Sequence, residues 1–149
     1  MHQLGQAAYS SLSQPVYITE ANYSRSDNTS REHPEISEVW LTFIECGKLT
    51  NDLGFRQTVV KILLAGIRVR TLYYAVDNNY CSDEVILDQH NHKYVTSRNA
   101  ETNHDYLVGV PNTGDHKSVR LVSVEELHGV EAQLGITRTA AIIETAPAL

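Results

Sequence analysis

The stretch Arg68–Leu87 reads RVRTLYYAVDNNYCSDEVIL, and our prediction of the fold starts from it. Two runs rich in β-branched and aromatic residues, Arg68–Val76 and Glu84–Leu87, flank the turn-forming cluster Asp77-Asn78-Asn79. Short strands that follow one another through polar turns pair with their neighbours in the chain. The stretch therefore predicts an antiparallel sheet made of sequential strands.

The same texture continues downstream. Further strands are predicted at Lys93–Ser97, Tyr106–Val110 and Lys117–Val122, separated by polar turns such as Pro111-Asn112-Thr113-Gly114. Ser123-x-x-Glu126 then forms a capping box, which opens a helix that ends at Gly135, and a final strand is expected at Ile136–Ile143. This half of the chain predicts an antiparallel β-meander or small barrel, one C-terminal capping helix and a final strand.

Upstream of Arg68, the spacing of apolar residues predicts two helices. From Pro34 onward, a helical stripe is formed by Ile36, Val39, Trp40, Phe43 and Ile44, and Gly47 supplies a stop. A second helix is expected from about Asp52 to Ala65, just before Gly66. We therefore expect an α+β fold with two N-terminal helices.

Residues 1–33 are rich in Ser, Gln, Asn and Tyr and show no sustained periodicity. They are interpreted as a polar N-terminal arm, with residues 34–149 as a single α+β domain. Tyr9, Tyr17 and Tyr23 would anchor the arm, because each joins a large apolar ring to a hydroxyl that can hydrogen-bond at a wet boundary. The arm either lies on a neighbouring molecule or packs on its own domain.

Length, charge and composition bear on the number of domains, the kind of partner and the cellular setting of the protein. A chain of 149 residues fits one hydrophobic core, and a net charge of -6 without a basic face argues against nucleic acid as a partner. No apolar run approaches the ~20 residues of a membrane-spanning helix. Residues 1–13 lack the pattern of a secretory signal, and the two cysteines suggest no disulfide framework. We expect an intracellular setting, either the cytoplasm or an assembled particle.

Histidine offers one route to chemistry. A metal-dependent hydrolase could use His90 and His92 with His104 or His116, because imidazole is a common metal ligand. Their spacing matches no metal-binding motif, so solvated histidines in turns are the preferred interpretation. The scattered glycines form no phosphate-binding loop, and no cofactor is expected.

A second alternative is a small-molecule or nucleotide-binding regulatory module. Its pocket would lie on the sheet, lined by tyrosines and by arginines that grip an anion. The residues that would form it are Arg68, Arg70, Tyr73, Tyr74, Tyr106 and Arg120. Core and cross-strand packing explains the same tyrosines without a ligand.

The leading hypothesis is a non-enzymatic structural or interaction subunit. In it the domain is copied into a homo-oligomer or a larger assembly, such as a virus or phage particle, and residues 1–33 lie across a neighbour. The absence of any recognisable catalytic motif and the nearly uncharged tail Ile136–Leu149 also motivate this hypothesis. It fails if the arm folds against its own sheet.

Overall fold

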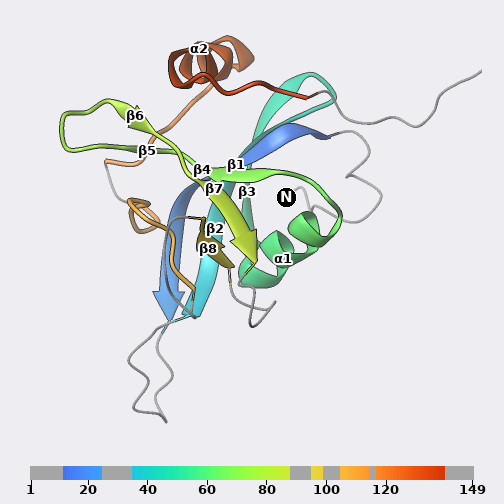
Figure 1. The fold of residues 1–149 in the computed structure, drawn as a ribbon, viewed down its shortest axis with the longest axis vertical. Helices are drawn as coiled ribbons and strands as arrows, with labels where there is room; N and C mark the ends of the chain where they lie inside the picture. Colours follow the sequence, from blue (N-terminus) through green and yellow to red (C-terminus); the bar gives the residue numbers. More distant parts are fainter. Residues whose placement is uncertain (1–11, 25–34, 88–94, 99–104, 115–116, 140–149) are drawn as a thin grey trace, which may run out of the picture.

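The computed structural model describes residues 12–24, 35–87, 95–98, 105–114 and 117–139, which form an α+β fold (Figure 1). A mixed six-stranded sheet has the strand order β3-β2-β1-β4-β7-β8, and β5 and β6 form a separate hairpin. None of the helices in these ranges is long and apolar enough to cross a membrane. The elements are β1 (Leu12–Ser24), β2 (Glu35–Glu45), β3 (Lys48–Phe55), α1 (Arg56–Leu64), β4 (Val69–Thr71), β5 (Tyr73–Tyr74), β6 (Tyr80–Cys81), β7 (Glu84–Leu87), β8 (Val95–Ser97) and α2 (Val124–Leu134).

Strand β1 is an interior strand of the sheet. It pairs antiparallel with β2 along its length and parallel with β4, where Val16 lies opposite Val69. The expectation of a polar arm is therefore wrong for Leu12–Ser24, while residues 1–11 and 25–33 lie outside the described ranges. Interior strands covered on both faces need not alternate between polar and apolar residues, so periodicity did not reveal β1.

The two faces of the sheet have separate hydrophobic cores. On one face, Val16 and Ile18 of β1 pack with Val59 and Ile62 of α1. On the opposite face, Tyr17 belongs to a cluster that includes Leu127 and Val130 of α2, together with Val119 and Leu121. Helices α1 and α2 consequently lie on opposite sides of the sheet (Figure 1).

The first predicted helix is wrong, because Glu35–Glu45 forms strand β2. Val39, Leu41 and Phe43 belong to the α1-side core, and Ile44 belongs to the α2-side core. Because both faces of β2 carry apolar residues, their positions in the sequence also match the spacing of a helix. The high strand propensity of Ile, Val, Trp and Phe favours the strand over the helix. Cys46 and Gly47, with φ of 53° and 78°, form the tight turn into β3 rather than the end of a helix.

The second predicted helix is correct only in part. Helix α1 begins at Arg56, whereas the segment Asp52–Phe55 ends strand β3. The Thr58 hydroxyl accepts a hydrogen bond from the Phe55 backbone N–H at 3.1 Å, which helps to fix the start of the helix. Gly66 follows the helix with φ of 84°.

The predicted strands after Gly66 are present in fragments. Strand β7 matches its prediction, and Val95–Ser97 falls within another, but Arg68–Val76 is divided between β4 and β5. Tyr106–Val110 contributes a single bridge, from Tyr106 to Thr96, and Lys117–Val122 has no regular partner strand within the described ranges. The parallel pairing of β1 with β4 also makes the sheet mixed instead of wholly antiparallel.

Helix α2 has the capping residues that the sequence predicts. The Ser123 hydroxyl accepts a 3.1 Å hydrogen bond from the Glu126 backbone N–H, and Gly135 ends the helix with φ of 71°. The Glu126 carboxylate accepts from the Val122 backbone N–H, one residue earlier than a capping box requires. Beyond α2 the described residues show one bridge, from Thr139 to Gln14, and the rest of the predicted final strand, 140–143, lies outside them.

Candidate functional site

A β-bulge in β1 places a carboxylate on the α2 side of the sheet. Ile18 pairs with Leu41 and Glu20 pairs with Trp40, so Thr19 is an additional residue between two consecutive pairs. Strict alternation would turn Glu20 toward the α1-side core that contains Ile18. The bulge instead lets Thr19 and Glu20 line the same cavity.

Glu20 is buried, with 1% of its surface exposed, and it has two partners. Its Oε1 accepts a 3.0 Å hydrogen bond from the Gly114 backbone N–H, and its Oε2 forms a 2.8 Å ion pair with Nη2 of Arg120. The Arg120 side chain remains 56% exposed. A buried carboxylate thus holds one end of a guanidinium whose other N–H groups stay accessible to a ligand.

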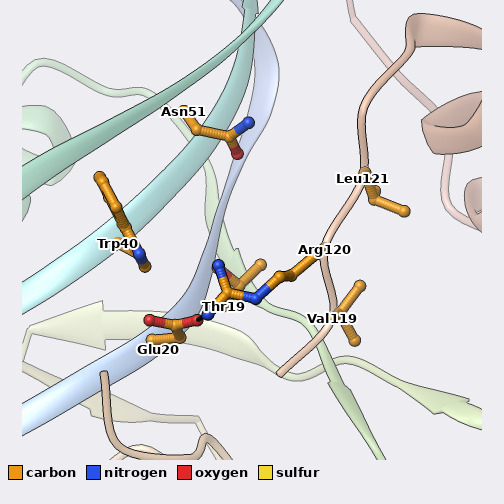
Figure 2. Close-up of a pocket in the computed structure, with 7 residues that line it drawn as sticks. All are labelled: Thr19, Glu20, Trp40, Asn51, Val119, Arg120 and Leu121. Atoms are coloured by element: carbon orange, nitrogen blue, oxygen red, sulfur yellow. Dashed lines mark ion pairs between the residues drawn. The ribbon is translucent and has the colours of Figure 1, made fainter. Parts of the chain in front are cut away.

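Figure 2 shows how the neighbouring strands complete the site. The Arg120 side chain extends from segment 119–121 toward Glu20, while Trp40 of β2 and Asn51 of β3 stand along the opposite side. The Thr42 hydroxyl donates a 2.6 Å hydrogen bond to Oδ1 of Asn51. This bond fixes the amide, so the Asn51 NH₂ group can donate hydrogen bonds.

These residues line a cavity of about 120 Å³ that is open to solvent on one side. The volume corresponds to about four water molecules, and it lies below the roughly 300 Å³ at which pockets for drug-sized ligands begin. Its walls combine an indole ring, the apolar side chains of Val119 and Leu121, one guanidinium, one carboxylate, one amide and one hydroxyl. The cavity is therefore suited to a small, partly apolar molecule and is too small to enclose a nucleotide.

Of the six residues predicted to form a ligand pocket, Arg120 alone lines this cavity. Arg70 donates hydrogen bonds to Oγ and the backbone oxygen of Ser82, and the Tyr73 hydroxyl donates to Oδ2 of Asp83 at 3.0 Å. Tyr74 packs its ring on Tyr80, with the centroids 5.2 Å apart. In the described contacts, Arg70, Tyr73 and Tyr74 each have partners other than one another, so they do not line one common pocket with Arg120.

The other two members of that set lie elsewhere. Arg68 donates to the Thr137 backbone oxygen at 3.0 Å and to Oγ1 of Thr139 at 3.1 Å, which ties down the segment after α2. Tyr106 is 43% exposed, and its backbone oxygen accepts from the Ser97 N–H at 2.9 Å. Neither residue is among those that line the cavity.

The predicted anchor tyrosines contact their own domain where the structure describes them. Tyr17 is fully buried, and its hydroxyl donates a 2.7 Å hydrogen bond to Oε2 of Glu131. The Tyr23 hydroxyl accepts a 3.0 Å hydrogen bond from the Leu107 backbone N–H. Burial raises the pKa of both hydroxyls, so they are neutral at physiological pH. Tyr9 lies outside the described residues.

The four histidines proposed as metal ligands all lie outside the described ranges: His90, His92, His104 and His116. Within those ranges, no group of three or more His, Cys, Asp or Glu side chains has the geometry of a metal site.

Six of the seven residues that line the cavity were missed by sequence reasoning: Thr19, Glu20, Trp40, Asn51, Val119 and Leu121. The available signal was the run Val16–Ala21, VYITEA, in which a carboxylate interrupts apolar residues. A charged residue within a buried strand requires a partner, so such an interruption indicates an ion pair. The sequence does not indicate that the partner comes from position 120.

Comparisons of the chain with protein-family models, with curated proteins and with solved structures found no match.

Proposed function

We propose that the chain is a non-enzymatic binding module that holds a small monocarboxylate in the cavity between Glu20, Trp40, Asn51 and Arg120. The observation that carries the proposal is the half-exposed guanidinium of Arg120, fixed by a buried carboxylate in the wall of a small cavity. Arginine presents five N–H donors in a planar fork, so it can bind one carboxylate through one edge and a second through another.

Charge favours a monoanion over a phosphate dianion. Glu20 and Arg120 together contribute no net charge to the cavity, and the whole chain carries -6. Each negative charge on a ligand adds to a cavity whose own pair is neutral, so a dianion is repelled by the acidic chain more strongly than a monoanion. The Asn51 amide can add one neutral donor, while Trp40 and Leu121 can contact an apolar group.

The test uses the chain's single tryptophan, Trp40, as a fluorescent reporter inside the cavity. Acetate, propanoate and benzoate are titrated against the protein, with benzamide as an uncharged analogue of benzoate. We expect a saturable change in emission with at least one carboxylate and a response to benzamide that is about tenfold weaker or more.

Two variants locate the response. Arg120→Gln should abolish the change in Trp40 emission, and Arg98→Gln should not, because Arg98 forms an exposed ion pair with Glu84 elsewhere on the sheet. No saturable response to any of the three carboxylates would refute the proposal. An equal response in Arg120→Gln and the unmodified protein would refute it as well.

A second candidate function, a subunit that associates with copies of itself, retains one supporting observation. This hypothesis was first based on an N-terminal arm that lies across a neighbouring copy. Tyr17 and Tyr23, which were expected to anchor that arm, instead lie in β1 of their own sheet. The remaining support is the exposure of Tyr74 and Val76 on the β5–β6 hairpin.

A further inference from the structure

The polar side chains that line the cavity around Arg120 are mostly hydrogen-bond donors. A guanidinium, an indole N–H and the NH₂ group of an amide can donate but cannot accept. The amide oxygen of Asn51 already accepts from the Thr42 hydroxyl, so the NH₂ group is the part of Asn51 that remains for a ligand. Glu20 is the strong acceptor of the site, but its Oε1 accepts from Gly114 and its Oε2 pairs with Arg120. A ligand in this cavity therefore needs acceptors rather than donors.

The indole of Trp40 adds a donor on the same cavity as the guanidinium. Figure 2 shows its nitrogen turned toward Glu20 and Arg120. Trp40 is half-buried, and none of the described residues accepts a hydrogen bond from its indole N–H. Such an N–H gains a hydrogen bond when a ligand brings an acceptor into a partly dry site. Because the indole N–H and the guanidinium face the same small cavity, the acceptor that suits both is an oxygen next to a ligand carboxylate.

We propose that the cavity prefers 2-oxo monocarboxylates, such as pyruvate, over the unsubstituted acid and the 2-amino acid. The inference rests on the proposed monocarboxylate site and names its ligand class. The carboxylate binds the exposed part of the Arg120 guanidinium, and the neighbouring 2-oxo oxygen accepts from the Trp40 indole N–H. The Asn51 amide supplies a second donor to the same end of the ligand, and Leu121 contacts its methyl group.

The related acids fit this set of donors less well. Propanoate has no oxygen next to its carboxylate, so it leaves the Trp40 N–H without a partner. Alanine places an ammonium group there, which can only donate and is repelled by Arg120. Lactate should rank between pyruvate and propanoate, because its hydroxyl can accept from Trp40 but also needs an acceptor for its own proton.

An NMR titration of the full, ¹⁵N-labelled chain with each acid tests this order. The backbone amide of Leu121 reports binding, and the single indole N–H signal of the chain reports Trp40. We expect a dissociation constant for pyruvate about fivefold below that for propanoate, and one for alanine about tenfold or more above that for pyruvate. The indole proton should move further downfield with pyruvate than with propanoate, because only pyruvate accepts its hydrogen bond.

Two variants separate recognition of the 2-oxo group from a purely structural role. Trp40→Phe keeps an aromatic ring and removes the N–H, while Asn51→Leu removes the second donor. Each should lower the ratio between the dissociation constants of propanoate and pyruvate toward one, whereas loss of structure would weaken both acids equally. The matched control is Gln57→Leu, which removes an exposed amide from α1 on the other side of the sheet and should keep the ratio.

The possible results distinguish this inference from the proposed function. Equal dissociation constants for pyruvate and propanoate would overturn the preference and leave the monocarboxylate site standing. A preference that survives unchanged in both Trp40→Phe and Asn51→Leu would overturn it as well, because the 2-oxo oxygen would then have other partners. If none of the carboxylates binds, the proposed function itself is wrong, and the inference falls with it.

Discussion

The hydroxyl of Tyr17, on the interior strand β1, donates a 2.7 Å hydrogen bond to Oε2 of Glu131 on α2. The same carboxylate oxygen lies 2.6 Å from Nη2 of Arg138, which also donates to the Pro15 backbone oxygen at 3.0 Å. Burial raises the pKa of Tyr17, and the hydrogen bond to Glu131 raises it further. The network therefore joins β1, α2 and the segment after α2 through a neutral hydroxyl and a buried ion pair.

Removing Arg138 should destabilise the protein strongly. The side chains of Arg138 and Glu131 are 12% and 5% exposed, so Arg138→Met leaves a buried carboxylate without its cation. We expect a loss of about 3 kcal/mol in the free energy of unfolding, measured by chemical denaturation. Arg98→Met is the control, because the Arg98–Glu84 pair is exposed and should contribute less than about 1 kcal/mol. Equal losses in the two variants would contradict this interpretation.

Gly109 should be intolerant of any side chain. Its φ is 78°, and a Cβ at this position would overlap the ring of Tyr73, which donates a hydrogen bond to Asp83. Gly109→Ala should therefore cost about 1 kcal/mol for the backbone conformation and about 2 kcal/mol more for displacing the ring. Gly66→Ala isolates the first contribution, because φ there is 84° and no atom lies within 4 Å of the added Cβ. The prediction fails if denaturation gives the same loss for both.

Asp105 should make stability depend on pH. Burial raises its pKa above the ordinary value of 3.8, although N–H groups of Val95 and Ile36 and the charge of Arg56 oppose the rise. Because the folded-state pKa exceeds the unfolded one, this carboxyl contributes most stability below pH 3.8. That contribution is lost as the pH rises through the folded-state pKa.

The Asp105→Asn variant isolates this effect. Its free energy of unfolding is compared with that of the unmodified protein at several pH values between about 3 and 7. The advantage of the unmodified protein should narrow as the pH rises, because the amide of the variant does not ionise. A constant or widening advantage would show that the folded-state pKa of Asp105 is not raised.

The parts of the fold predicted from sequence are those governed by local signals. Ser123 and Gly135 bound α2 because a hydroxyl cap and a left-handed glycine act within one turn of the helix. Strand β7 was recognisable because the turn residues before it and its β-branched content act together. The α+β class follows from these elements.

The parts that were missed depend on contacts between distant residues. Strands β1 and β2 are covered on both faces, by α1 on one and α2 on the other, and that burial removes the alternation that identifies a strand. Of the residues that line the candidate cavity, the sequence predicted only Arg120 as a site residue. Its partner Glu20 reaches it through a bulge, and the position of a bulge depends on the pairing partner and not on residue type.

The place of β1 in the sheet also constrains the order in which the chain can fold. Its antiparallel partner β2 is the next strand in the chain, but its parallel partner β4 comes only after β3 and α1, and Gln14 meets Thr139 only after α2. Contacts between residues so far apart close large loops, which slows folding. When a nascent chain has emerged from the ribosome only as far as β3, the edge of β1 that pairs with β4 has no backbone partner. At this stage the unpaired edge is exposed to aggregation, which is the condition that chaperones counter.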